Sequence, residues 1–296
     1  MEFVLDDSNP ILKEYYSQDN YRDIILRKEG KKCIIFFSGN GIYVPNDKKA
    51  FEDVIIEKDR YEWENLSDSE EIKLWADRII FMRDIYKSWY VKGINEKINS
   101  VGEVVKWISQ VTQGWDVVTC GNSAGGYMAA VVGSKIGAKC IFSFGGQWNI
   151  THALQEYRLI QERYSGNCEY LDLTSLLKEN KVPTFWFYSA KNDFDLVQYR
   201  FFSMNKVPYV YDFAMDSDEH GFVLLNGCYK KLLPLDIKQV IELYEKYQGE
   251  IINLRRFCLE LMEWKEAWPD LKKDIIKHHK SLQILRKYIL FRNHKC

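Results

Sequence analysis

Short runs of apolar, β-branched and aromatic residues recur along the chain and predict buried strands. Four of them are bounded by turn residues and cover residues 33–37, 115–120, 139–144 and 184–188. Each run is almost continuously apolar, which is typical of strands covered on both faces, as in a parallel sheet. A fifth run, residues 209–213, alternates more strongly and is expected nearer an edge of the sheet.

Helical periodicity fills the intervals between these runs. One apolar stripe, which Gly114 would end, comprises Val101, Val104, Val105, Ile108 and Val111; a second predicts a helix through Ile72, Trp75, Ala76, Ile79, Met82 and Tyr86. Strands that alternate with helices imply right-handed crossovers and a doubly wound, mostly parallel α/β sheet. Functional sites in such sheets lie at the carboxyl ends of the strands.

Residues 117–134 carry no charge over 18 residues, a length at which a transmembrane helix has to be considered. Three glycines, Asn122 and Ser123 lie in the middle of this segment, and such a cluster weakens a helix. A strand, a tight turn and a new helix make use of each of these residues instead. We therefore expect no transmembrane segment.

The tight turn itself, Gly121-Asn122-Ser123-Ala124-Gly125-Gly126, stands between a predicted strand and a helix-compatible run, residues 127–132. This is the context of a nucleophile elbow, in which a strained serine is lifted clear of the sheet and its neighbours must be small. Ser123 is the candidate nucleophile, and Gly121 and Gly125 meet the steric demand. At this point the chain resembles the α/β-hydrolase superfamily, over about residues 30–248.

A serine hydroxyl needs a base to take its proton, and that base needs an acid to orient it. The resemblance implies the chain order serine, acid, histidine. His220 follows the strand run 209–213 and is the candidate base; Asp193 follows the run 184–188 and is the expected acid, with Asp195 as the alternative. The resemblance also implies an oxyanion hole made by the Ala124 N–H and a second N–H from the Ser38–Gly41 loop, which Asn40 or Gly41 would supply.

The substrate is less well defined by the sequence. The spacer at residues 149–182 is too short for a large lipase-type lid, which favours a small acyl group. Gln147 and Trp148, just after a predicted strand, offer polar and aromatic surface for binding a sugar, although ordinary packing accounts for Trp148 equally well. No Cys/His/Asp cluster has metal-ligand spacing and no phosphate loop is present, so neither a metal nor a cofactor is expected.

A second, less specific resemblance is to α/β-hydrolase-like proteins of bacterial capsule and surface-glycan pathways, some of which are O-acetyltransferases. Those acetyltransferases carry Lys where Ala124 stands here. We therefore expect a serine hydrolase acting on a small acyl ester, with an acylated surface glycan as one substrate class. The alternatives are an O-acetyltransferase of capsule or surface polysaccharide, with acetyl-CoA as acyl donor, and a binding or assembly protein that keeps the fold without catalysis.

Charge and composition complete the expectations. The formal net charge of −1 argues against nucleic-acid binding, and the N-terminal residues lack a signal-peptide pattern, so a cytoplasmic location is expected. Seven widely spaced cysteines predict reduced thiols.

Residues 1–250 are expected to form the catalytic domain. Residues 251–296, with 11 basic and 5 acidic side chains, predict a helical extension, either packed on that domain or in contact with a membrane surface or anionic glycan.

Overall fold

One eight-stranded sheet forms the frame of the computed structural model, which describes residues 3, 8–156, 170–221, 224, 226–263 and 272. Its strands lie in the order β1-β3-β2-β4-β5-β6-β7-β8, and only β1 runs antiparallel to its neighbour. The strands are β1 (Tyr21–Ile25), β2 (Lys32–Phe37), β3 (Arg78–Met82), β4 (Asp116–Asn122), β5 (Cys140–Phe144), β6 (Thr184–Ser189), β7 (Val210–Met215) and β8 (Ile251–Ile252). This is the predicted mostly parallel α/β sheet, of α/β-hydrolase type.

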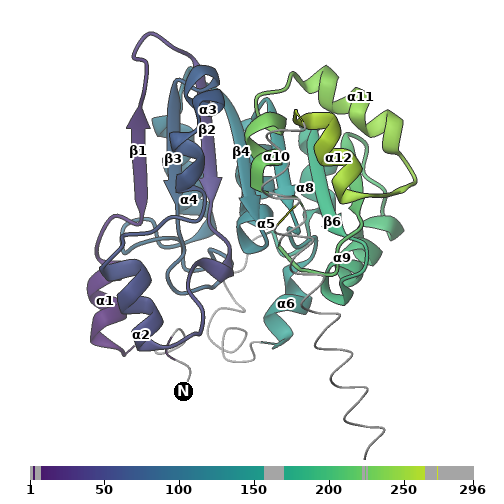
Figure 1. Ribbon diagram of the computed structural model, residues 1–296. Coiled ribbons are helices and arrows are strands. Elements are labelled where there is room, and N and C mark those ends of the chain that lie inside the picture. The colour runs from purple at the N-terminus through teal and green to yellow at the C-terminus, as the bar shows by residue number, and fades with distance from the viewer. Residues whose placement is uncertain are drawn as a thin grey trace, which may run out of the picture.

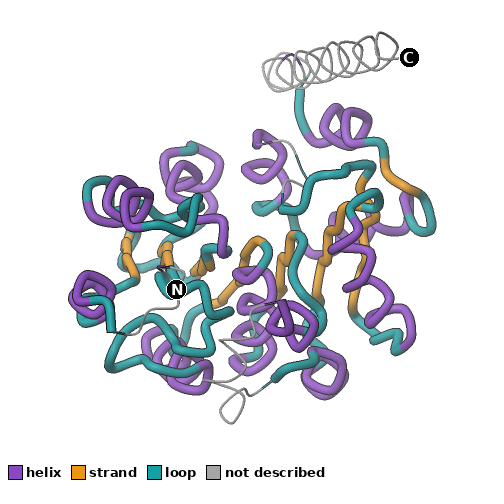
Figure 2. The backbone as a smooth tube through the Cα atoms, turned by 90° about the horizontal axis from the view of Figure 1, so that it is seen from below, coloured by secondary structure: helices purple, strands orange, loops and turns teal. Residues whose placement is uncertain are grey.

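Helices cover both faces of the sheet, as Figure 2 shows. One face packs against α4 (Val101–Val111), α5 (Ala124–Ile136), α8 (Leu173–Asn180) and α9 (Asp193–Met204). The other packs against α3 (Glu70–Trp75), α10 (Asn226–Leu232), α11 (Ile237–Tyr247) and α12 (Leu254–Leu261). Successive β2 residues alternate between the two cores, with Ile35 in the first and Ile34 and Phe36 in the second. Burial on both faces is why the strand sequences are almost continuously apolar.

Short helical elements connect this frame. Along the chain they are α1 (Pro10–Tyr16), η2 (Asn40–Ile42), α2 (Lys48–Phe51), η3 (Glu52–Ile56), η4 (Glu64–Asp68) and α6 (Ile150–Glu156). The two longer helices predicted by periodicity and by the elbow pattern, α4 and α5, are both present (Figure 1). Ser100 begins α4 by accepting the Glu103 N–H, and Gly137, at a φ of 65°, ends α5.

The second predicted helix, through residues 72–86, is wrong. Helix α3 ends at Trp75, and the strand β3 follows from Arg78 to Met82 with all five residues buried. A strand buried on both faces places apolar residues at every spacing, including the helical one, so periodicity alone could not separate the two.

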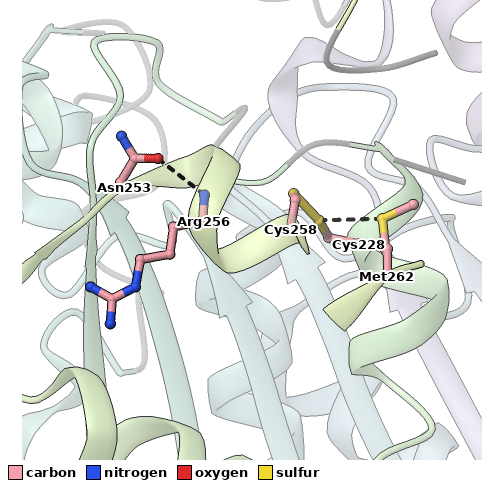
Figure 3. The surroundings of a disulfide bond; sticks show 5 residues. All are labelled: Cys228, Asn253, Arg256, Cys258 and Met262. Atoms are coloured by element: carbon pink, nitrogen blue, oxygen red, sulfur yellow. Dashed lines mark hydrogen bonds between the residues drawn. A yellow bond between two sulfur atoms is a disulfide. The ribbon is translucent and has the colours of Figure 1, made fainter. Parts of the chain in front are cut away.

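The expectation of reduced thiols is wrong for one pair of cysteines. Cys228 of α10 and Cys258 of α12 form a disulfide with their Cα atoms 5.9 Å apart, and Met262 lies beside them (Figure 3). The remaining described cysteines, Cys33, Cys120 and Cys140, are free and buried. Strand β8, paired with β7, and helix α12 thus attach residues 251–262 to the sheet.

Two sequence-based expectations fall on residues outside the described ranges. The basic helix predicted in the C-terminal extension lies in residues 264–296, of which only residue 272 is described, and the middle of the predicted short lid lies in residues 157–169. Within the described part of the chain, no helix combines the length and the apolar character needed to cross a membrane.

Candidate active site

Ser123 lies in a sharp turn between the end of β4 at Asn122 and the start of α5 at Ala124, with φ 53° and ψ −121°. A Cβ atom at Gly121 would lie 2.1 Å from the Gly125 carbonyl oxygen, and one at Gly125 would lie 2.1 Å from the Phe37 carbonyl oxygen. Neither position therefore accepts a side chain. The turn has the strained backbone and the steric demand that the elbow pattern predicts.

The Ser123 hydroxyl lies 2.8 Å from Nε2 of His220, and Nδ1 of the same imidazole lies 2.5 Å from Oδ1 of Asp195. The side chain of Asp195 is 1% exposed and that of His220 is 30% exposed. The second oxygen of Asp195 accepts the Ser189 N–H at 2.8 Å. The buried carboxylate is therefore held from both sides, and the imidazole is oriented so that Nε2 meets the hydroxyl.

Asp195, and not the expected Asp193, is the carboxylate that meets His220. The Asn192 side chain accepts the Asp195 N–H and caps α9, so Asp193 is the first residue of the helix. Because each helical residue is rotated by about 100°, side chains two residues apart point to nearly opposite faces of the helix. Asp193 is accordingly exposed to solvent, whereas Asp195 is buried beneath the imidazole.

The loop that follows β2 lies against the elbow, as an oxyanion hole requires. A Cβ atom at Gly39 would lie 2.6 Å from the Asn122 carbonyl oxygen, so the approach depends on glycine. The Gly39 N–H donates to Oε2 of Glu62 at 2.5 Å and is engaged there. The predicted donors from this loop, Asn40 or Gly41, and Ala124 at the N-terminus of α5 remain the candidates.

Gln147 lies against Ser123, the candidate nucleophile. Its Nε2 is 3.3 Å from the Ser123 Oγ, and its Oε1 accepts the Trp89 indole N–H at 2.9 Å. Because an indole N–H only donates, this second bond fixes the orientation of the amide and presents an N–H to Oγ. Gln147 is thus a fully buried polar partner of the Ser123 hydroxyl.

Trp148 does not offer its ring to a substrate. It is buried in the core against Trp186, its backbone N–H donates to Gln198, and its indole N–H donates to Thr174. The expectation that Trp148 binds substrate is therefore corrected in favour of the packing alternative. Both residues lie in the loop after β5, where bonds to Trp89 and Ser123 hold the Gln147 side chain at the site, while a bond to Thr174 holds the Trp148 ring in the core.

The loop that carries Trp89 is organised by hydrogen bonds to the buried carboxylate of Asp84. Asp84 accepts the backbone N–H groups of Tyr86, Ser88 and Tyr90, and Trp89 and Tyr90 have φ values of 54° and 60°. Burial raises the pKa of Asp84, while these hydrogen bonds lower it. The loop is held by internal bonds, and it places the indole N–H on Gln147.

Glu62 is a site residue for which the sequence carries no signal. It lies between η3 and η4, and its carboxylate accepts the Gly39 N–H and the Asn122 side-chain N–H, the latter at 3.2 Å. Burial raises the pKa of Glu62 and the two hydrogen bonds lower it. No motif surrounds this residue, because its partners come from distant parts of the chain.

Among the described residues, no group of three or more His, Cys, Asp or Glu side chains is arranged to hold a metal ion.

No protein-family model and no curated protein matches the chain. Solved structures that resemble it include the capsule O-acetyltransferase of Neisseria meningitidis serogroup A, with 14% identity, a TM-score of 0.47 and coverage of 78% of this chain and 90% of that one. A fluorophosphonate-binding serine hydrolase of Staphylococcus aureus has 12% identity and a TM-score of 0.47, covering 77% and 95%. A lipase/esterase of Lactobacillus plantarum has 10% identity and a TM-score of 0.43, covering 78% and 99%. The likeness is one of fold.

Proposed function

We propose that this chain is a serine hydrolase that cleaves a small acyl ester through an acyl-enzyme on Ser123. The observation that carries the proposal is the continuous hydrogen-bonded path from Asp195 through His220 to Ser123. Three residue types that have to meet for this chemistry come from three separate segments and meet in the required order.

In the proposed first step, Nε2 of His220 takes the hydroxyl proton while Oγ of Ser123 attacks the ester carbonyl carbon. The carbonyl oxygen becomes an oxyanion, which the Ala124 N–H and an N–H of Asn40 or Gly41 stabilise. Asp195 stabilises the imidazolium. The tetrahedral intermediate then collapses, His220 returns the proton to the leaving alcohol oxygen, and the acyl group stays on Oγ.

A second nucleophile resolves the acyl-enzyme. Water or a glycan hydroxyl attacks the acyl carbonyl carbon while His220 takes its proton; the bond between the acyl carbon and Oγ then breaks, and His220 returns the proton to Oγ of Ser123. Water gives a carboxylic acid, whereas a glycan hydroxyl gives a new ester, and the donor would then be an acyl thioester such as acetyl-CoA. Because Trp148 is buried in the core, its ring offers no aromatic surface to a sugar. Hydrolysis of a small ester is therefore the leading proposal, with transfer to a glycan as the alternative outcome.

A fluorophosphonate probe tests the proposal without knowledge of the substrate. We expect covalent labelling of the wild-type protein and faster hydrolysis of p-nitrophenyl acetate than of p-nitrophenyl octanoate. Acetyl-CoA consumption that requires an added glycan would support transfer instead. Absence of both labelling and ester turnover would contradict an enzyme of this type and favour a non-catalytic binding protein.

Gln147→Leu should lower kcat/KM for p-nitrophenyl acetate by about 5- to 10-fold, the effect of one lost hydrogen bond of about 1 kcal/mol to Oγ. Trp89→Phe removes the N–H that orients the amide and should give a smaller loss. The Trp89 effect should disappear when Gln147 is already leucine, because the indole acts on Oγ through the amide. Additive losses would show that the two side chains act separately.

A further inference from the structure

We propose that Glu62 is a positioning residue that holds the oxyanion loop, residues 38–41, against the nucleophile elbow. The inference rests on the proposed function and extends it to a carboxylate outside the Ser123–His220–Asp195 set. Glu62 acts through its two hydrogen-bond partners, Gly39 and Asn122, each of which is next to a residue of the reaction site.

The contacts of Glu62 join two segments that are far apart in the sequence. Its backbone N–H donates to Oγ of Ser38 at 3.2 Å, and its Oε2 accepts the Gly39 N–H at 2.5 Å. Its Oε1 accepts a hydrogen bond from Nδ2 of Asn122 at 3.2 Å. One side chain therefore ties the loop after β2 to the residue that precedes Ser123.

A carboxylate suits this place because both of its partners are donors. An ionised carboxylate only accepts hydrogen bonds and has lone pairs for both N–H groups, whereas an amide of the same shape presents one oxygen and one NH₂ group. Within the described residues the Glu62 carboxylate forms no ion pair, and each of its two oxygens accepts one N–H. The pKa of Glu62 is raised, because burial outweighs the bonds from Gly39 and Asn122 and the charge of Arg60, which lower it.

Two consequences for the site follow from these bonds. With its N–H bound to Glu62, Gly39 is fixed, and the next two N–H groups of the loop are presented from a defined position. Asn122 also borders the base, because a Cβ atom at Gly221 would lie 3.1 Å from Nδ2 of Asn122, and Gly221 follows His220. Glu62 thus supports the oxyanion loop directly, and its second partner, Asn122, lies next to the residue that follows His220.

Glu62→Gln tests the proposal, and Glu64→Gln is the matched control. Glu64 lies two residues away and carries the same group, but its carboxylate meets Arg22 and the Tyr61 N–H instead. For Glu62→Gln we expect a 10- to 100-fold loss in kcat for p-nitrophenyl acetate with KM within about twofold, since an oxyanion hole acts on the transition state. Fluorophosphonate labelling and the affinity of a trifluoromethyl ketone should fall by a similar factor. The control should behave as wild type.

Several outcomes would overturn the role of Glu62: wild-type kcat in Glu62→Gln, a loss confined to KM, or an equal loss in Glu64→Gln. If Glu62→Gln fails to fold, Glu62→Asp is measured in the same way. It keeps the charge but is too short to reach both donors, so unchanged kcat in that variant would also contradict the proposal. A wild-type protein that neither takes the probe nor cleaves any ester would contradict the proposed function itself, and the two failures are therefore distinguishable.

Discussion

Replacing Ser123 by alanine is expected to abolish fluorophosphonate labelling and to lower ester turnover by roughly 10⁴-fold or more. The change removes one hydroxyl oxygen, the atom that the proposed mechanism makes the nucleophile. Folding should be preserved, because the residue is partly exposed and its hydroxyl bonds only within the site. The measurements are probe labelling, p-nitrophenyl acetate hydrolysis and the melting temperature.

Ser134→Ala provides the control for this prediction. Ser134 lies within α5, the helix that Ser123 precedes, and among the described residues its buried hydroxyl has no hydrogen-bond partner, so its loss should change neither labelling nor stability. His220→Ala should be nearly as damaging as Ser123→Ala, and the double variant hardly worse than either, since the residues act as a unit. Turnover that survives in Ser123→Ala would assign the nucleophile to another residue.

The sequence predicts those elements whose conformation follows from residues close together in the chain. Strands buried on both faces are continuously apolar, and the four continuously apolar runs coincide with the parallel strands β2, β4, β5 and β6. The fifth, predicted nearer an edge, is β7, which has only the two-residue β8 beyond it. The elbow was recognisable because a strained serine requires small neighbours within a few positions.

The elements that were missed depend on partners distant in the sequence. Strand β1, an edge strand with half-exposed residues, has no apolar run, and the burial of β3 on both faces erases the alternation that separates a strand from a helix. The Cys228–Cys258 disulfide joins residues 30 apart, a spacing that matches no local motif. Glu62 belongs to the same class, since Gly39 and Asn122 become its neighbours only when β2 and β4 pair.

Asp195 rather than Asp193 contacts His220 for a reason of register. Asp193 and Asp195 both follow β6, and position after the strand does not tell them apart. The Asn192 cap decides where α9 begins, and the start of the helix decides which carboxylate turns inward. Gln147 and Trp148 were separated in the same way, by the direction of two adjacent side chains.

The two aspartates therefore give the sharpest remaining test. In Asp195→Asn the Ser189 N–H still needs an acceptor, so the amide oxygen should stay on Ser189 and the NH₂ group should face Nδ1 of His220. A donor at that position forces the imidazole proton onto Nε2, the atom that must accept the serine proton.

We expect Asp195→Asn to lower kcat/KM by roughly 10³- to 10⁴-fold, because the imidazole is held in the wrong tautomer and its cation loses the neighbouring charge. Asp193→Asn makes the identical chemical change on an exposed residue of the same helical turn, and it should alter kcat/KM by less than about twofold. Both variants are compared in p-nitrophenyl acetate hydrolysis. A reversed ranking would return the acid to Asp193 and would mean that the first turn of α9 rearranges when substrate binds.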